Sequence, residues 1–298
     1  MKFIIMQPGI GYRRDYLWLP KMYMQSTVPI KQVLTFPIMG EAPISSWMET
    51  EHHLVVPRHF LPIEAYASMP YEIRDINPVV FPRVSMFAKS DLRGPIQTMA
   101  FAEMTERGDG IVSILPGKGK TVLALIEWAT LRCPGLVVVH TQDLAYQWRD
   151  RILEHTTATE DDIGWVQGDR KEWEKPITIA MLQTLVRMVE DDKLPEDLRR
   201  HFGYIVTDEV HHLGATSFQI TASIGYGRRR GLSATHERED GMSPLFYHHI
   251  GPVIYESGEH DVIPETFFKQ TGVVLPLSTL VTLKDRTGET SMAKLYQW

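Results

Sequence analysis

The sequence predicts an α/β fold, a doubly wound parallel sheet with helices on both faces, preceded by a small β-rich domain. From residue 91 to about residue 256, fully apolar runs of four to six residues alternate with helical stretches. Such runs are typical of parallel strands that are buried on both faces and joined by crossover helices. Up to residue 90, the sequence is instead interrupted by prolines and is rich in aromatic residues and short apolar runs, which favours short strands and turns.

The elements of the α/β part are expected in a regular order. Apolar runs predict the strands, and the longer stretches between them have the apolar spacing of helices. Strands are expected at residues 111–115, 135–140, 177–180, 203–209 and 231–235, and helices at 121–132, 143–155 and 181–191. After about residue 250 the alternation fades. We therefore expect an accessory domain at residues 1–90, an α/β domain at 91–256 and a tail or linker at 257–298.

The composition is that of a globular protein and excludes several classes. With 43% of residues hydrophobic and 23% charged, the chain can bury sizeable cores. The single cysteine, Cys133, allows no internal disulfide and no cysteine cage for zinc, which favours a reducing compartment. No apolar stretch approaches the roughly 20 residues of a membrane span, so we expect a cytoplasmic protein without a membrane partner.

The net charge of −6 argues against a generally cationic nucleic-acid binder. Residues 1–90 hold nine basic and seven acidic side chains, for +2, whereas the rest hold 22 and 30, for −8. A polyanion must therefore be bound by local loops and dipoles or by the N-terminal part. There, residues 12–18 interleave cations with aromatic rings that could stack on bases, but we favour an amphipathic strand with solvated arginines.

A candidate phosphate loop, ILPGKGKT, occupies residues 114–121 between a predicted strand and a predicted helix. Two glycines let backbone N–H groups turn inward, and the start of the helix adds its positive dipole end. Lys120 can reach the β- and γ-phosphates of a nucleotide, and Thr121 can hold Mg²⁺. Ile114 stands where the Gly-x-x-x-x-Gly-Lys-Thr pattern has its first glycine, so an ordinary glycine-rich turn remains an alternative. The expected binding residues are Pro116, Gly117, Lys118, Gly119, Lys120 and Thr121.

Two carboxylates follow another predicted strand, YIVTDE at residues 204–209. Ligands bind at the carboxyl ends of strands in open α/β sheets. We expect Asp208 to bind Mg²⁺ and Glu209 to polarise the water that attacks the γ-phosphate. A solvated loop is the alternative, but a phosphate loop upstream favours the catalytic interpretation. The adjacent histidine pairs lack the spacing of a helical zinc site.

With these motifs the sequence resembles superfamily-two DExH helicases and translocases, in particular those of DNA repair, DNA recombination and phage branch migration. ILPGKGKT is similar to motif I of that family, and DEVHH at residues 208–212 is similar to motif II. Segments similar to motif Ia, motif Ib, motif III and the adenine-contacting stretch lie at residues 137–148, 177–185, 231–241 and 91–97. The motifs cover residues 91 to about 256. The resemblance implies a RecA-like P-loop domain that uses ATP and Mg²⁺ and binds single-stranded or branched DNA.

The resemblance also implies roles for individual residues. The expected adenine contacts are Arg93 and Gln97. The expected nucleic-acid contacts are Thr141, Gln147, Trp148, Gln183 and Thr184. The expected couplers of nucleotide state to DNA binding are His211, Ser233 and Thr235. For Gln147 and Trp148, simple helix packing is an equal alternative. His236 stands where the family usually has proline, which can alter loop stiffness.

The family closes its ATP site between two RecA-like domains, and the second supplies arginine fingers worth roughly 10³ to 10⁵ in rate. No second set of motifs follows residue 256, and residues 228–230 lead into motif III and are not expected to be a finger. We therefore expect the N-terminal half of a helicase motor, completed by a second RecA-like domain in cis or in trans, with weak turnover of its own. The alternatives are a restriction-type DNA translocase subunit and a non-catalytic, nucleotide-responsive DNA-binding partner of a complete helicase. The expected setting is the cytoplasm of a bacterial or phage-infected cell.

Overall fold

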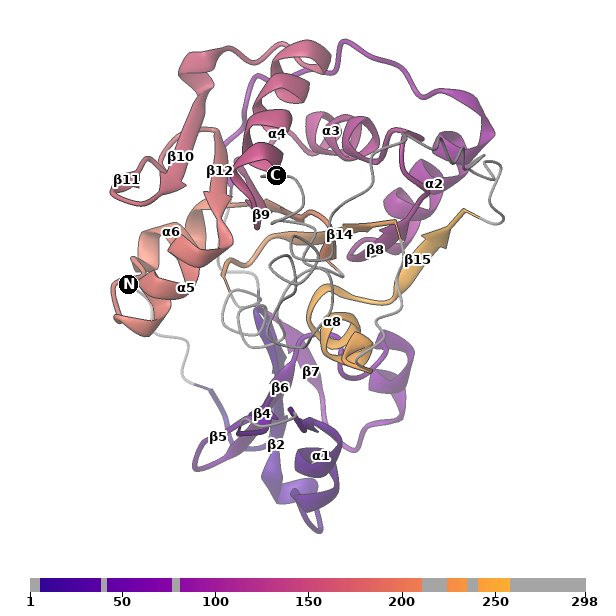
Figure 1. Cartoon of the computed structure of the whole chain (residues 1–298). Coiled ribbons are helices and arrows are strands. Elements are labelled where there is room, and N and C mark those ends of the chain that lie inside the picture. The colour runs from indigo at the N-terminus through magenta and orange to yellow at the C-terminus, as the bar shows by residue number, and fades with distance from the viewer. Residues whose placement is uncertain (1–5, 39–41, 77–80, 211–223, 235–240, 258–298) are drawn as a thin grey trace, which may run out of the picture. The chain divides into compact units, whose positions relative to one another are not determined.

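The computed structural model confirms the doubly wound α/β fold and the β-rich part that precedes it (Figure 1). It describes residues 6–38, 42–76, 81–210, 224–234 and 241–257. All of these lie in one compact unit, Met1–Gly258, and a second unit, Glu259–Trp298, lies outside the described residues. None of the helices in the described ranges is long and apolar enough to cross a membrane.

The larger sheet has eight strands in the order β11-β10-β12-β9-β13-β14-β8-β15. All neighbours are parallel except β10 and β11, which are antiparallel. The strands are β8 (Gly110–Ser113), β9 (Gly135–Val139), β10 (Ile163–Gln167), β11 (Arg170–Lys171), β12 (Ile177–Met181), β13 (Tyr204–Thr207), β14 (Arg228–Ser233) and β15 (Val253–Glu256). The carboxyl ends of the parallel strands therefore share one edge of the sheet.

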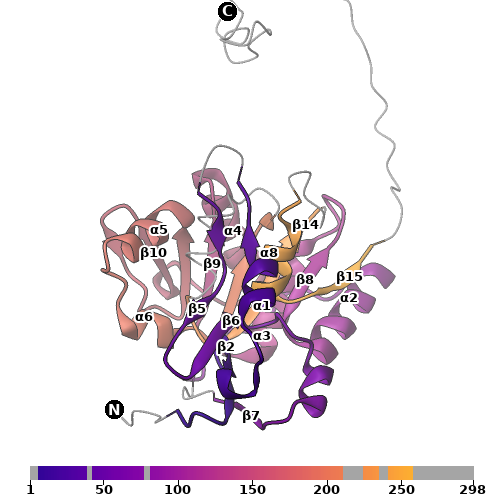
Figure 2. The same cartoon turned by 90° about the horizontal axis from the view of Figure 1, so that it is seen from below.

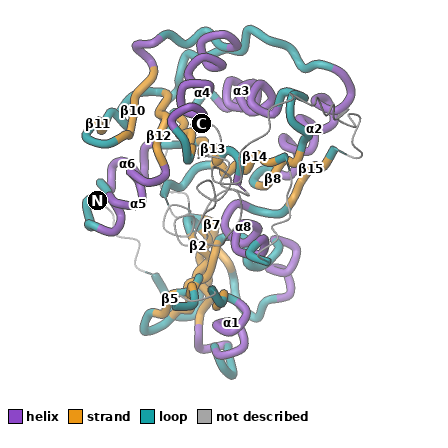
Figure 3. Tube along the Cα trace, viewed as in Figure 1, coloured by secondary structure: helices purple, strands orange, loops and turns teal. Residues whose placement is uncertain are grey.

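Helices cover both faces of this sheet, as Figure 3 shows. They are α2 (Gly94–Arg107), α3 (Lys120–Leu131), α4 (Gln142–His155), α5 (Leu182–Glu190), α6 (Glu196–His201) and α8 (Ser243–Ile250). Side chains of α2, α3 and α4 form one apolar core with alternate residues of β9, Val137 and Val139. Side chains of α5, α6 and α8 form a second core with Leu136 and Val138, because successive strand residues point to opposite faces.

The β-rich part contains a five-stranded sheet in the order β5-β6-β2-β1-β7, seen from below in Figure 2. Its strands are β1 (Gly11–Arg13), β2 (Tyr16–Pro20), β5 (Met48–Glu49), β6 (His53–Pro57) and β7 (Ile73–Asp75). The β-rich part also contains the helix α1 (Val28–Val33) and a separate two-stranded sheet of β3 (Thr35–Phe36) and β4 (Ile44–Ser45). Leu17, Leu19, Leu54 and Val56, alternating on β2 and β6, build its small core with Leu34.

Several elements of the α/β part were not predicted, namely α2, α6, α8, β10, β11 and β15. The helix α2 starts at Gly94 and Pro95, and its buried face is made of Gln97, Ala100 and Met104, so it lacks a strong apolar stripe. The strand β10 carries a glycine at its second position, which weakens a strand signal. Both elements are held by their neighbours rather than by local preference.

The predicted domain boundaries stay predictions.

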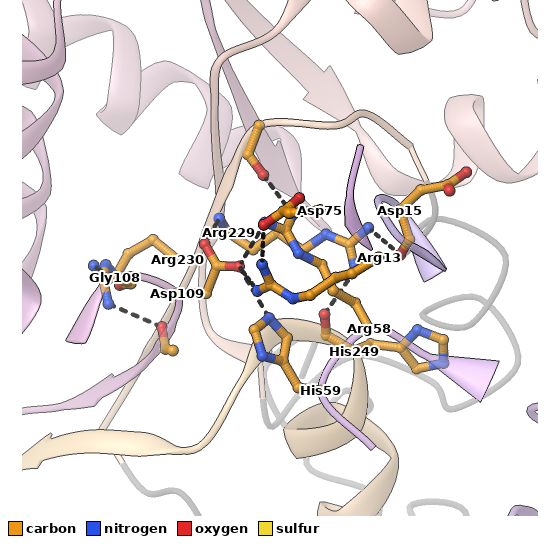
Figure 4. A network of polar contacts seen from close by, with 12 residues as sticks. Arg13, Asp15, Arg58, His59, Asp75, Gly108, Asp109, Arg229, Arg230 and His249 are labelled. Atoms are coloured by element: carbon orange, nitrogen blue, oxygen red, sulfur yellow. Dashed lines mark hydrogen bonds and ion pairs between the residues drawn. The ribbon is translucent and has the colours of Figure 1, made fainter. Parts of the chain in front are cut away.

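A buried polar network joins the two sheets, shown in Figure 4. Its centre is Asp109, which directly precedes β8. The Asp109 carboxylate pairs with Nη2 of Arg58 at 3.2 Å and Nε2 of His59 at 2.9 Å, and it accepts a hydrogen bond from the backbone N–H of Arg229 at 3.0 Å. Arg229 on β14 donates in turn to the backbone oxygens of Asp15 and His249, at 2.9 and 2.7 Å. The smaller sheet is thus bound to the strand that leads into the phosphate loop.

The electrostatics of this joint follow from its burial. Burial alone would raise the pKa of Asp109, but the charge of Arg58 and the contacts with His59 and the Arg229 backbone outweigh it, so the pKa lies well below its usual range. Burial and the nearby charge of Arg58 lower the pKa of Arg229 to about 10. Burial lowers the pKa of His59, and burial with the Arg229 charge lowers that of His249 further. The joint is therefore built from an ionised aspartate, arginines and neutral histidines.

Candidate functional site

The candidate phosphate loop lies between β8 and α3, at the carboxyl edge of the larger sheet. The helix α3 begins at Lys120, so the N–H groups of its first turn and its positive dipole end face the loop. Gly119 caps the helix with φ 86°, and Gly117 has φ 77°; both values lie in the left-handed region that favours glycine. The glycines are thus required by the backbone path of the loop.

The side chain of Gln97 supports this loop from α2. Its Nε2 donates to the backbone oxygen of Lys118 at 2.9 Å, and its Oε1 accepts from the backbone N–H of Arg93 at 2.7 Å. Gln97 is 5% exposed, and a Cβ at Gly119 would lie 2.4 Å from its Nε2. The structure therefore places the two expected adenine contacts beside the phosphate loop, with Gln97 packed under it.

The two expected catalytic carboxylates follow β13 at the same edge of the sheet. Nζ of Lys120 lies 3.4 Å from Oε1 of Glu209, so the end of β13 meets the start of α3. Glu209 has φ 47°, an uncommon value for a residue other than glycine and one that tends to occur at functional sites. The two motifs that were predicted separately thus form one site.

These residues line a single cavity of about 430 Å³, which we call the loop pocket. Its lining residues are Arg93, Pro116, Gly117, Gly119, Lys120, Thr121, Val122, Leu144, Gln147, Trp148, Arg151, Glu154, His155, Asp208 and Glu209. Thr121 and Asp208 bring a hydroxyl and a carboxylate to this pocket. Oxygen ligands of this kind, completed by substrate phosphates, are the ones that Mg²⁺ prefers, so the donors fit that ion.

Asp208 is buried, with 6% exposure, and its carboxylate is held by two hydrogen bonds. Oδ2 accepts from the indole Nε1 of Trp148 at 2.7 Å, and Oδ1 accepts from the backbone N–H of Glu209 at 3.0 Å. Burial raises the pKa of Asp208, and the Trp148 hydrogen bond partly opposes that shift. A buried carboxylate with a raised pKa gains from a cation placed beside it.

The comparison with protein families decides what this arrangement belongs to. A family model described as "Type III restriction enzyme, res subunit" matches residues 85–238, just over half of the chain. The chain belongs to this family. The match spans the phosphate loop, the carboxylates after β13 and most of the larger sheet. We refer to it below as the res family.

Relatives of this res-family chain are found in bacteria and archaea. A Kineococcus radiotolerans protein named "DNA 3'-5' helicase XPB" is 35% identical over 193 residues, which cover 64% of this chain and 34% of that protein. A Haloarcula marismortui protein named "Putative DNA 3'-5' helicase Rad25" is 39% identical over 150 residues, 50% of this chain and 24% of that protein. The chain thus spans about a quarter to a third of these relatives' length.

Among solved structures, the UvsW helicase from bacteriophage T4 resembles this res-family chain with a TM-score of 0.61 and 12% identity. The similarity covers 83% of this chain and 99% of that one. At this identity it supports the fold alone. Because it extends over 83% of the chain, it includes more than the residues that the family model matches.

The expected nucleic-acid contacts of this res-family chain fall into two groups. Thr141, which caps α4 and accepts a hydrogen bond from the Leu144 N–H, lies at the carboxyl end of β9. Gln183 donates to the backbone oxygen of His140 at 3.0 Å, and Thr184 accepts from the Gly168 N–H at 3.1 Å. These three lie at the carboxyl edge of the sheet, where the strands β9 and β12 end.

The other two nucleic-acid candidates lie in the loop pocket. Gln147 lines it, and Trp148 is 1% exposed with its indole N–H on Asp208. The expected contact of Trp148 with nucleic acid does not fit this burial, and packing inside the helix layer, the alternative weighed for it, describes it better. Among the expected couplers, Ser233 is buried at the end of β14, and its backbone oxygen accepts from the Ile114 N–H. His211 and Thr235 lie outside the described residues.

A buried charge network of the res-family chain was not predicted. Arg230 is fully buried and donates to Glu127, at 2.7 Å from Nη2 and 3.0 Å from Nε, and to the backbone oxygen of Gly108 at 2.6 Å. Tyr204 donates to the same carboxylate at 2.5 Å, and Arg228 at 3.2 Å. Arg228, Arg229 and Arg230 therefore bind within the sheet and its joint, as expected for residues that are not an arginine finger. Two features of the sequence could have indicated this network: three consecutive arginines at residues 228–230 at the start of a strand, and a glutamate, Glu127, within a mainly apolar helix.

Proposed function

We propose that this chain contains the ATP-binding part of a DNA helicase or translocase of the DExH type. One observation carries the proposal. The phosphate loop and the strand-end carboxylates, far apart in the sequence, line one pocket in which Lys120 lies 3.4 Å from Glu209. In this proposal the loop N–H groups and Lys120 bind the phosphates, and Glu209 orients the attacking water.

Thr121 and Asp208 would hold Mg²⁺ in this site. When bound, the ion neutralises charge that develops on the phosphates. The residues of the chain supply the rest: the loop fixes the phosphates, Asp208 is held in place by hydrogen bonds, and Glu209 accepts a proton from water. Arg93 would contact the nucleotide base, and Gln97 would act through its hydrogen bond to Lys118.

DNA is the proposed polymer substrate. The names of two relatives, "DNA 3'-5' helicase XPB" and "Putative DNA 3'-5' helicase Rad25", support DNA over RNA. Thr141, Gln183 and Thr184 are the proposed backbone contacts, since they share the carboxyl edge of the sheet with the loop pocket. The proposed settings are DNA repair and recombination in a bacterial or phage-infected cytoplasm.

A second RecA-like domain, in cis or in trans, is the proposed partner that completes the ATP site. The contacts of β14 support this proposal, because Arg228, Arg229 and Arg230 are engaged elsewhere. Because an arginine finger is worth roughly 10³ to 10⁵ in rate, we expect ATP turnover to rise when such a domain is supplied.

Binding of a fluorescent ATP analogue tests the proposal. Lys120→Ala removes the cation that faces the phosphates, so binding should weaken at least tenfold in the presence of Mg²⁺. Lys193→Ala, which removes a lysine whose side chain is 73% exposed and pairs with Asp191, is the matched control and should bind like the unmodified chain. Equal binding by all three proteins would refute the proposed ATP site.

The family description favours one alternative, a DNA translocase that serves a restriction enzyme. A DNA-dependent nuclease partner that co-purifies with the full-length protein would support it. A non-catalytic, nucleotide-responsive DNA-binding partner is the other alternative. DNA affinity that depends on nucleotide and stays intact in Glu209→Gln, with no ATP turnover even when a second RecA-like domain is supplied, would favour that function.

A further inference from the structure

The carboxylate of Asp208 is held from two directions. One oxygen accepts from the backbone N–H of the next residue, Glu209, and the other accepts from the indole of Trp148 at 2.7 Å. The first contact joins adjacent residues, so the local backbone conformation alone can form it. The second comes from a different element, α4, and is a hydrogen bond to a carboxyl group, which in its ionised form is a stronger acceptor than a neutral group.

The indole of Trp148 is itself fixed. It is 1% exposed and packs in the apolar core that α3, α4 and the sheet share. The indole N–H can donate a hydrogen bond but cannot accept one, so Asp208 must be the acceptor. Trp128 on α3 shows the contrasting case, since its Nε1 donates to the backbone oxygen of Cys133 at 2.9 Å, and it does not line the loop pocket.

We propose that Trp148 is a positioning residue of the ATP site, which orients the Asp208 carboxylate toward the Mg²⁺ of the bound nucleotide. The inference rests on the proposed ATP-binding function. Outer partners that hydrogen-bond a metal ligand fix its direction, and their loss typically weakens metal affinity about 10- to 100-fold. Any buried indole N–H needs an acceptor, but the acceptor of Trp148 is a carboxylate of the loop pocket, whereas that of Trp128 is a backbone oxygen.

The position of Trp148 on α4 has a consequence for coupling. The helix begins after Thr141, one of the proposed nucleic-acid contacts, and Trp148 lies two turns further along it. At a rise of about 1.5 Å per residue, the seven-residue separation between Thr141 and Trp148 corresponds to roughly 10 Å along the helix axis. The helix thus links the proposed DNA-binding edge with the proposed Mg²⁺ ligand.

The test measures binding of a fluorescent ATP analogue to the full chain while Mg²⁺ is titrated, and again in EDTA. Trp148→Phe keeps an aromatic ring and removes the donor. It should raise the Mg²⁺ concentration for half-maximal binding about 10- to 100-fold, while affinity in EDTA changes less than about twofold. Trp128→Phe, which removes an equally buried indole donor, should leave the Mg²⁺ requirement unchanged. Circular dichroism checks folding, and Trp148→Leu is a second donor-free variant.

Each outcome separates the possibilities. An unchanged Mg²⁺ requirement in folded Trp148→Phe and Trp148→Leu would overturn the inference while the ATP-binding proposal stands. Equal losses with Mg²⁺ and in EDTA, or an equal shift in Trp128→Phe, would show a packing role and would also overturn it. If the unmodified chain binds no nucleotide under either condition, the proposed function itself fails.

Discussion

Replacing Asp109 by asparagine tests the buried joint between the two sheets. The side chain keeps its size but loses the negative charge that faces Arg58 at 3.2 Å and His59 at 2.9 Å. Removing one partner of a buried ion pair leaves an uncompensated charge and costs about 3 to 5 kcal/mol. The asparagine oxygen can still accept from the Arg229 N–H, so we expect the lower end, about 3 kcal/mol. For a protein of this size, that loss lowers the melting temperature by about 6 to 12 °C.

Thermal and urea unfolding of Asp109→Asn measure this loss, and Asp75→Asn is the matched control. Both carboxylates face Arg13, but the Asp75 side chain is 63% exposed and that of Asp109 is 8% exposed. An exposed pair contributes about 0 to 1 kcal/mol, so the control should unfold close to the unmodified chain. A loss below about 1 kcal/mol for Asp109→Asn, or equal losses for the two variants, would refute the argument that the charge of Asp109 holds the joint together.

Three further predictions follow from other contacts. Gly119→Ala places a Cβ at a residue with φ +86°, 2.4 Å from Nε2 of Gln97. This strain should distort the phosphate loop and weaken nucleotide binding about tenfold or more. Unchanged affinity in a nucleotide titration would contradict this. Tyr204→Phe removes a donor to buried Glu127 and should cost about 1.5 to 3 kcal/mol in urea unfolding, so an unchanged midpoint would count against the network. Burial lowers the pKa of His249, so the folded chain keeps this histidine neutral at pH values where the unfolded chain protonates it, below about pH 6.5. The free energy of unfolding should therefore fall as the pH drops below about 6.5, by up to about 1.4 kcal/mol per pH unit. The fall should be less steep in His249→Gln.

The sequence predicted much of the fold because its signals are local. The apolar run that became β9 is buried on both faces, and the stretch after it is the amphipathic helix α4. Residues 114–121 predicted a phosphate loop because they bring two glycines, a lysine and a threonine close together between a strand and a helix. The strand β10 and the helix α2 were not predicted because neighbouring elements, rather than their own periodicity, hold them.

The sequence by itself thus determined the fold class, and it located the candidate phosphate loop and the acidic strand end, since each depends on residues that are adjacent in the chain. Only the tertiary structure decided the partners of the buried polar groups. Trp148 meets Asp208 across 60 residues of sequence, Arg230 meets Glu127 across 103, and His59 meets Asp109 across 50. These pairs depend on which strands become neighbours and on which helix face is buried, and a polar side chain in the sequence does not specify its distant partner. The physical reason is that burial makes an unpaired polar group costly, so the folded packing selects the pairs.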